Sequence, residues 1–253
     1  MRPPLRKLLF ESLYKNRYLY RFASTIPFAG QWRIWQQLVI PRIKGHDVLE
    51  LGCGLGDLLA DILEAGYTGR AVEHSPQMVA AARDTLRKRK VGQASWVIQG
   101  SAQQLPFSDH MFDTVVSTFP TEYIFDPATI AEVERVLRPG GRIVIIEAGN
   151  LLPVGYLQPV LLLFHLLVYG PAGIFQSHAQ RQQQQQNVRQ ADSAEFFTEE
   201  LPTTVFGNLI PLEQCGLQRR SERVRSQRWE VYITIGEKLQ GKTAITSIRR
   251  ENI

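Results

Sequence analysis

The stretch DVLELGCGLGDLLADILEAGY, residues 47–67, is the feature that most constrains the fold. An apolar strand-like run ends at Glu50, glycines follow at alternate positions (Gly52, Gly54 and Gly56), and a helical pattern then begins. Glycine behind a strand allows a sharp turn and lets a ligand approach the main chain closely. The amides at the start of the next helix then face that ligand. The stretch therefore predicts a cofactor loop at the carboxyl edge of a parallel sheet, with an ordinary tight turn as the simpler alternative.

The chain around this loop alternates strand and helix patterns. Strands are expected at RAVEH, SWVIQG, FDTVVSTF and RIVIIEAG, and helices at SPQMVAAARDTLRKRK and DPATIAEVERVLRPGG. Ser75 and Asp126, each followed by proline, are typical helix starts. The second helix is expected to end at Gly140–Gly141. Such alternation indicates a parallel sheet that is covered on both faces.

The spacing of the glycines separates two classes of cofactor. The dinucleotide fingerprint is G-x-G-x-x-G, whereas this loop contains G-x-G-x-G and places Asp57 where the last fingerprint glycine belongs. A carboxylate at Glu50 repels a pyrophosphate but attracts an ammonium group. A cofactor with an amino-acid end and an adenosine end therefore fits better than a dinucleotide.

Four blocks of sequence, in this order, carry a resemblance to a known family: VLELGCGLGD, AVEHSPQMVAAAR, GSAQQLPFSDHMFDTVVSTF and EVERVLRPGGRIVIIE. Over roughly residues 46–148 the chain resembles the class I S-adenosylmethionine-dependent methyltransferases of the small-molecule, UbiE-like group. The resemblance implies an α/β fold with a Rossmann-like, doubly wound sheet of seven strands, the last one antiparallel. It also implies S-adenosyl-L-methionine as the cofactor. A strand pair predicted at RRSERVRSQ and RWEVYITIGEK agrees with this topology.

The resemblance assigns the methionine moiety of the cofactor to the first block. The residues assigned there are Glu50, Gly52, Cys53, Gly54 and Gly56.

Four further residues are expected at the cofactor by the same resemblance. Glu73 is expected to accept the ribose hydroxyls, and His74 to edge the adenine. An exposed strand-end glutamate and a surface histidine are the simpler alternatives. Ser101 and Ala102 occupy the adenine-edge segment, where the family usually has an acidic residue at the position of Ser101.

Phe119 follows the fourth predicted strand, where cofactor and acceptor meet in this family, although packing in the core is an equal alternative. Methyl transfer is an in-line displacement, so the protein mainly has to hold the acceptor. Where the acceptor atom also loses a proton, Glu122, Tyr123 and His165 are candidate bases, and the catalytic residue stays open. No metal is expected, because the two cysteines lack the spacing of a metal site or a disulfide framework.

Two other functions are weighed against a small-molecule methyltransferase. A nucleic-acid methyltransferase is disfavoured, because TFPTEYIF lacks the Pro-Pro-aromatic motif and neither cysteine is placed as a nucleophile. The arginines of the C-terminal strands are expected on a solvated face; they are Arg219, Arg220, Arg223, Arg225 and Arg228. A non-catalytic, cofactor-binding assembly or regulatory protein stays open, because fold does not fix function.

The sequence divides into five segments. They are an N-terminal helical segment (1–45), the cofactor-binding core (46–148), an apolar cap with a Gln-rich loop (149–200), a C-terminal helix and strand pair (201–240) and a flexible tail (241–253). Residues 151–175 contain no charged side chain, yet proline and glycine interrupt them and they connect two parts of one sheet, which argues against a membrane span. A buried core helix is one explanation. A hydrophobic cap over a small, lipid-like or quinone-like acceptor is the preferred one.

The setting of the protein follows from its composition. Few cysteines and no secretory signal predict a cytoplasmic protein. A net charge of +5 suits an acidic small molecule, an anionic membrane surface or nucleic acid, and does not choose among them. The basic N-terminal helix, with its apolar face, suits peripheral contact with anionic membrane headgroups. Nothing in the sequence indicates an oligomeric state.

Overall fold

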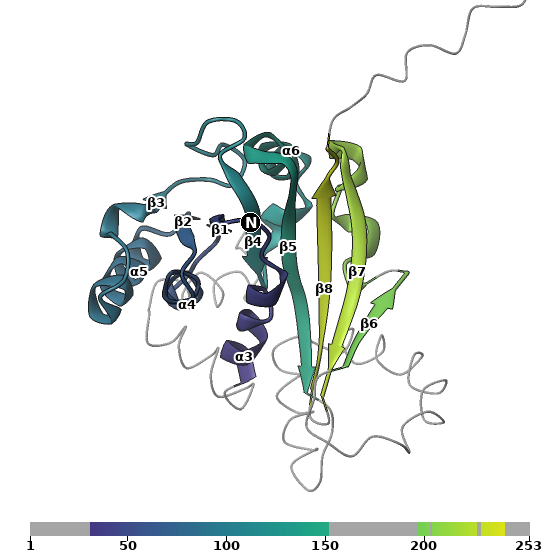
Figure 1. Cartoon of the computed structure of the whole chain (residues 1–253), viewed down its shortest axis with the longest axis horizontal. Coiled ribbons are helices and arrows are strands. Elements are labelled where there is room, and N and C mark those ends of the chain that lie inside the picture. The colour runs from purple at the N-terminus through teal and green to yellow at the C-terminus, as the bar shows by residue number, and fades with distance from the viewer. Residues whose placement is uncertain (1–30, 152–196, 203, 227–228, 241–253) are drawn as a thin grey trace, which may run out of the picture.

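The computed structural model describes residues 31–151, 197–202, 204–226 and 229–240. Its centre is one sheet with the strand order β3-β2-β1-β4-β5-β8-β7-β6 (Figure 1). The strands are β1 (Asp47–Leu51), β2 (Thr68–Glu73), β3 (Val97–Gln99), β4 (Phe112–Thr118), β5 (Leu137–Leu151), β6 (Phe197–Leu201), β7 (Leu217–Arg225) and β8 (Trp229–Lys238). The first five strands are mutually parallel, whereas β8 pairs antiparallel with both β5 and β7. The expected doubly wound sheet with an antiparallel C-terminal strand is therefore confirmed.

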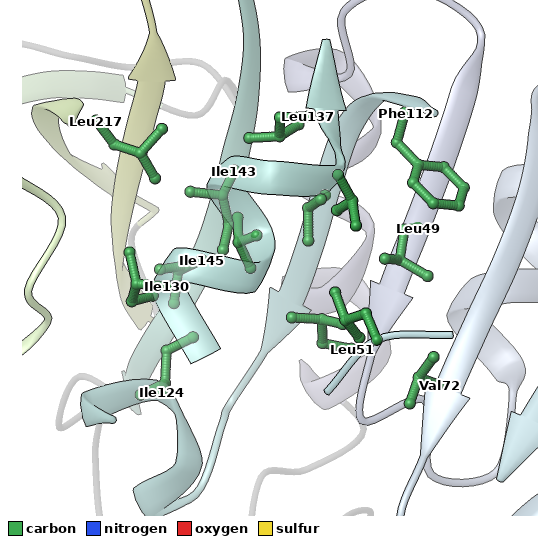
Figure 2. Packing of buried hydrophobic residues seen from close by; sticks show 14 of the residues in the cluster. Leu49, Leu51, Val72, Phe112, Ile124, Ile130, Leu137, Ile143, Ile145 and Leu217 are labelled. Atoms are coloured by element: carbon green, nitrogen blue, oxygen red, sulfur yellow. The ribbon is translucent and has the colours of Figure 1, made fainter. Parts of the chain in front are cut away.

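Helices cover both faces of this sheet. The α-helices are α3 (Gln31–Gln37), α4 (Asp57–Glu64), α5 (Pro76–Arg89) and α6 (Pro127–Val136). The 3-10 helices are η1 (Ile40–Arg42), η2 (Ala94–Trp96), η3 (Glu122–Phe125), η5 (Gly207–Leu209) and η6 (Glu213–Cys215). Trp35 of α3 and Ile62 of α4 share one core with Val48 and Val144, while α6 packs on the opposite face. Figure 2 shows that second core, in which Ile130 of α6 lies against the β5 side chains.

Alternation along β1 decides which side chains can reach the cofactor loop. Leu49 and Leu51 point to the face that α6 covers, and Val48 to the face that α3 and α4 cover. Successive strand residues point to opposite faces, so Glu50 shares the face of Val48. The side chain of Glu50 is therefore directed towards α3 and α4.

The predicted helix starts are confirmed. Ser75 caps α5 by accepting a hydrogen bond from the Met78 amide at 3.4 Å, and Asp126 caps α6 by accepting one from the Ala128 amide at 2.9 Å. Each cap satisfies an amide that has no partner inside its helix.

Three details of the expected fold are corrected. The sheet has eight strands rather than seven, because β6, at the end of the segment predicted as cap and loop, pairs antiparallel with β7. Helix α6 ends at Val136 rather than at Gly140–Gly141, since Pro139 disfavours helical conformation in the residue before it. The predicted C-terminal helix is replaced by η5 and η6, which Pro211 separates.

The remaining predicted segments lie largely outside the described residues. Of the N-terminal helical segment, the structure describes residues 31–45, and of the predicted cap it describes residues 149–151 and 197–200, which belong to β5 and β6. The flexible tail, 241–253, also lies outside them. No helix in the described part of the chain has the length and apolar character that a membrane span requires.

Candidate functional site

The glycine loop joins β1 to α4 at the carboxyl edge of the sheet. Gly52, Gly54 and Gly56 all have left-handed backbones, with φ of 72°, 52° and 76°. Gly52 is the solvent-exposed one of the three, and its amide is tied to the Val72 carbonyl of β2 at 2.8 Å. A Cβ at Gly52 would lie 2.9 Å from the Tyr123 hydroxyl. The loop therefore requires glycine for its backbone shape and leaves a main-chain surface that a ligand can approach.

Gly56 has a packing role in the same loop. A Cβ at this position would come within 2.8 Å of the Ala82 Cβ and 2.9 Å of the Ala82 Cα. Helix α5 thus lies directly against the loop, and the small side chain of Ala82 allows that approach. The glycine that packs the loop against a helix is Gly56 here. In the dinucleotide fingerprint the corresponding glycine would stand one residue later, at position 57.

Glu73, at the end of β2, is hydrogen-bonded to the glycine loop. One carboxylate oxygen accepts a hydrogen bond from the Gly54 amide at 2.9 Å, and the other accepts one from the Ser75 amide at 2.9 Å. The side chain is buried. Each carboxylate oxygen has a second lone pair, so two ribose hydroxyls can still be accepted. Glu73 can therefore accept hydrogen bonds from the Gly54 and Ser75 amides and, as proposed, from the ribose hydroxyls as well.

Glu50 is a buried carboxyl group with an unsatisfied oxygen. The residue is 1% exposed, and its Oε2 has no hydrogen-bond partner in the described part of the chain. Burial raises the pKa of Glu50 to about 8, and the charge of Arg33 opposes that rise. A buried acceptor without a donor is costly. A cationic donor placed here would satisfy the oxygen and favour the ionised form.

Cys53 lies inside the loop between these two acids. The thiol is buried, and burial together with the carboxylates of Glu50 and Glu73 holds its pKa well above the usual range. A neutral thiol is a poor nucleophile, so Cys53 packs the loop rather than reacting.

Helix α3 connects α4, the helix that follows the glycine loop, to the end of β4, which the sequence did not indicate. The Arg33 guanidinium forms an ion pair with Asp61 of α4, and the Gln37 amide donates to the same carboxylate at 2.9 Å. On the other side Gln36 donates to the Thr118 hydroxyl of β4 at 3.2 Å. These contacts join residues far apart in sequence, so no local pattern announces them.

Phe119 stands at the exit of β4 with an unusual backbone. Its φ is 50°, its amide donates to the Ile146 carbonyl at 2.7 Å, and its ring stacks on Trp32 with centroids 4.0 Å apart. The residue packs against the core that α3 covers. Packing is thus shown, and the expected contact with a cofactor or acceptor stays a prediction.

The candidate bases have different surroundings. The Tyr123 hydroxyl donates to the Leu51 carbonyl at 3.1 Å and lies 2.8 Å from the Ser117 hydroxyl, which ties η3 to the ends of β1 and β4. Glu122 is exposed. His165 lies outside the described residues. The bonds of Tyr123 favour a structural role for its hydroxyl.

The predicted adenine-side residues lie beside the end of β2. The Gly100 amide donates to the Glu73 carbonyl at 3.1 Å, which brings the following turn at Ser101 next to Glu73. The Ser101 hydroxyl is bonded to Gln103, Ala102 is half-buried and His74 is exposed. The structure brings the adenine-edge segment and the ribose candidate together and leaves His74 at the surface.

Two of the C-terminal arginines, Arg219 and Arg223, are paired and buried within the protein, which corrects the expectation of a solvated face for them, whereas Arg220 is exposed. Arg219 forms an ion pair with Glu213 and donates to the Gly207 carbonyl at 2.8 Å. Arg223 forms an ion pair with Glu199 of β6, and both arginine side chains are about nine-tenths buried. Guanidinium groups engaged in this way are not available to phosphates.

The site can be tested for its fit to S-adenosyl-L-methionine. The orphaned oxygen of Glu50 suits an ammonium group, the main chain at Gly52 is exposed to solvent, and Glu73 retains acceptor capacity for a ribose. Within the described residues no group of three or more His, Cys, Asp or Glu is arranged to hold a metal ion. The fold is Rossmann-like, and the residues at the glycine loop fit the chemistry of S-adenosyl-L-methionine.

Comparison with known proteins shows what the chain is similar to. Residues 49–145 match the family described as "Methyltransferase domain". The demethylmenaquinone methyltransferase of Lactiplantibacillus plantarum is 31% identical over 149 residues, which cover 56% of this chain and 62% of that protein. The UbiE protein of Haemophilus ducreyi, a ubiquinone/menaquinone biosynthesis C-methyltransferase, is 35% identical over 125 residues, 47% of this chain and 48% of that protein. The chain thus spans about half to two thirds of these relatives.

Solved structures show the same fold. The PH0226 protein of Pyrococcus horikoshii superposes with a TM-score of 0.52 at 18% identity, covering 83% of this chain and 91% of that one. A SAM-dependent methyltransferase from Aquifex aeolicus gives a TM-score of 0.50 at 17% identity, covering 81% and 89%. These likenesses show that the Rossmann-like fold is shared.

Proposed function

We propose that this protein transfers a methyl group from S-adenosyl-L-methionine to a small, apolar acceptor of the quinol type. The observation that carries the proposal is the unsatisfied, buried Oε2 of Glu50 beside the left-handed glycine loop. A buried carboxyl oxygen without a hydrogen-bond donor is a cost that folding alone does not explain. Binding of a cofactor with an ammonium group removes that cost.

Each part of the site has a task in this proposal. Glu50 holds the amino-acid end, Gly52 lets the main chain approach it, and Glu73 accepts the ribose hydroxyls. The turn at Ser101 and Ala102 borders the adenine, and His74 lies at its outer edge. When bound, S-adenosyl-L-methionine supplies a methyl group that is already activated on a sulfonium. The protein then has to hold the acceptor in line, which favours a rigid wall at Phe119.

The class of acceptor is supported by the relatives rather than by the site. Two of them are named for methylation in menaquinone or ubiquinone biosynthesis. A quinone ring is electrophilic, whereas its reduced form is electron-rich and can attack a methyl carbon. We therefore expect the reduced form of the ring to be the substrate. An apolar acceptor of this kind also suits the uncharged segment 151–175 and peripheral contact with a membrane.

The proposal is tested with cofactor that carries a radioactive methyl group. The purified protein is incubated with reduced demethylmenaquinone, with its oxidised form, or with transfer RNA, and the organic and aqueous products are separated. Label in the organic product of the reduced quinone alone is the expected result. Label in the RNA fraction would overturn the proposed quinol acceptor and indicate a nucleic-acid acceptor instead.

A calorimetric control separates enzyme from binding protein. If S-adenosylhomocysteine binds but no acceptor is labelled, including a total lipid extract, the non-catalytic alternative gains support. The Glu73→Ala variant serves as the matched control, because transfer should fall with cofactor affinity.

A further inference from the structure

The charges around Glu50 are arranged asymmetrically. Glu73 of β2, together with Asp57 and Asp61 of α4, adds negative potential at the Glu50 carboxyl, whereas Arg33 of α3 adds positive potential. The acids lie on strand β2 and helix α4, and the cation comes from α3, which crosses the same face. Glu50, whose Oε2 has no hydrogen-bond partner in the described part of the chain, thus lies on the face of the sheet that α3 and α4 cover, within electrostatic range of the Arg33 guanidinium.

The Arg33 guanidinium is fixed in place by α3 and α4. One terminal nitrogen donates to the Gln36 side chain at 3.2 Å, and the other donates to the Asp57 carbonyl at 3.4 Å and pairs with Asp61. Its side chain remains 35% exposed. A guanidinium has five N–H donors, so this one keeps donor capacity beyond these contacts.

Asp61 is not an exclusive ion-pair partner of Arg33. Its other oxygen pairs with Arg89 of α5 at 2.7 Å, and the Gln37 amide donates to the oxygen that Arg33 contacts. Asp61 is therefore shared between two guanidinium groups, of which Arg89 also pairs with Glu64. Arg33 retains positive potential beside the N-terminus of α4, where the helix dipole adds to it.

We propose that Arg33 binds the carboxylate of the cofactor's methionine end while Glu50 binds its ammonium group. The inference rests on the proposed cofactor and deepens it by naming a binding residue outside the glycine loop. Opposite charges in fixed positions select a zwitterionic α-amino-acid group in one orientation. A guanidinium suits this task because its fork matches a carboxylate.

The inference predicts a difference between two ligands that share adenosine. S-adenosylhomocysteine carries the amino-acid end, whereas 5′-methylthioadenosine lacks it. Arg33→Met should weaken S-adenosylhomocysteine about tenfold or more, the usual effect of losing a charge-assisted hydrogen bond. The same variant should leave the affinity for 5′-methylthioadenosine within about twofold of wild type.

Isothermal calorimetry with both ligands is the measurement. Arg87→Met is the matched control, because Arg87 is 71% exposed on α5 and pairs with Asp84 there. It should change neither affinity. Arg33→Lys keeps the charge and should recover part of the lost affinity for S-adenosylhomocysteine.

The outcomes separate the inference from the proposed function. Equal weakening of both ligands in Arg33→Met would make Arg33 a purely structural residue and overturn the inference. Should Arg33→Met not fold, the ratio of the two affinities in Arg33→Lys decides, and an unchanged ratio overturns the inference. If the wild type binds neither ligand, the proposed function fails with it.

Discussion

The ring of Trp32 stacks on the ring of Phe119 with centroids 4.0 Å apart and planes inclined by 28°. Phe119 has a φ of 50°, a region that side chains with a Cβ rarely adopt. Its amide is also bonded to the Ile146 carbonyl of β5. The stack and the hydrogen bond together hold the exit of β4 in a strained conformation. Strain of this kind is retained where the surrounding structure determines the position, often at functional sites.

Replacing Phe119 separates the strain from the stack. Phe119→Ala and Phe119→Gly both lose the stacked ring, but only alanine keeps a Cβ in the left-handed region. Phe119→Gly should therefore be more stable than Phe119→Ala by about 1 kcal/mol, opposite to the usual order of the two residues. Urea unfolding measures the difference. A glycine variant that is the less stable of the two would show that Phe119 is not strained.

Glu73→Ala should weaken S-adenosylhomocysteine and 5′-methylthioadenosine alike, because both ligands carry the ribose. Charge-assisted hydrogen bonds contribute roughly 1.5–3 kcal/mol, so both affinities should fall about tenfold or more. Glu73→Gln keeps one acceptor oxygen and should lie between the wild type and Glu73→Ala. Calorimetry on folded variants gives the answer, and unchanged affinities would restrict Glu73 to its contacts with the Gly54 and Ser75 amides.

Glu50 should make the stability of the ligand-free protein depend on pH. Its pKa of about 8 in the folded state exceeds the ordinary value of 4.5, so the folded state binds more protons between these two values. The stabilising contribution is therefore complete below about pH 4.5 and is lost as the pH rises through 8. The slope is at most about 1.4 kcal/mol per pH unit. Chemical unfolding from pH 5 to 8.5 measures it.

Glu50→Gln is the control for that slope, because glutamine resembles the protonated acid and does not titrate. The difference in unfolding free energy between wild type and Glu50→Gln should shift with pH in favour of the variant as the pH rises. Parallel profiles for the two proteins would mean that the Glu50 pKa is not raised.

Cofactor binding should also release a proton at neutral pH. An ammonium group next to Glu50 favours the ionised carboxylate and lowers its pKa. The binding enthalpy of S-adenosylhomocysteine at pH 7 should therefore vary between buffers of different ionisation enthalpy, with up to about one proton released. Calorimetry in phosphate and in Tris measures the number. The same number in Glu50→Gln would assign the proton to another group.

The sequence predicted those parts of the site that local chemistry determines. Alternate glycines behind Glu50 indicated the loop, and the serine at position 75 indicated the start of α5, because turns and caps depend on a few neighbouring residues. The predicted site residues Gly54 and Glu73 are joined by a hydrogen bond. Their binding of the cofactor stays a prediction.

The parts that the sequence did not predict depend on contacts between distant residues. Trp32 and Arg33 gave no signal, because their partners Phe119 and Asp61 stand in other segments. Strand β6 was missed for a similar reason. Its residues FTEEL lack the alternation of a half-buried strand, and pairing with β7 decides their conformation.

Gly56 offers a test of how tightly α5 is packed against the cofactor loop. Gly56 and Gly66 both have left-handed backbones, with φ of 76° and 92°. A Cβ at Gly56 would lie within 3 Å of the Ala82 Cβ, whereas a Cβ at Gly66 would have nothing within 4 Å. The pair therefore separates backbone strain from steric overlap.

Gly66→Ala should cost about 1–2 kcal/mol, the usual cost of a left-handed backbone with a Cβ. Gly56→Ala should cost that amount and about 1–3 kcal/mol more, because the added methyl group overpacks the contact with α5. Urea unfolding of both variants measures the two costs. Binding of S-adenosylhomocysteine should weaken in Gly56→Ala and not in Gly66→Ala, since only the first substitution displaces the loop that carries Gly54. Equal destabilisation of the two variants would mean that α5 moves aside freely and that Gly56 matters for its backbone alone.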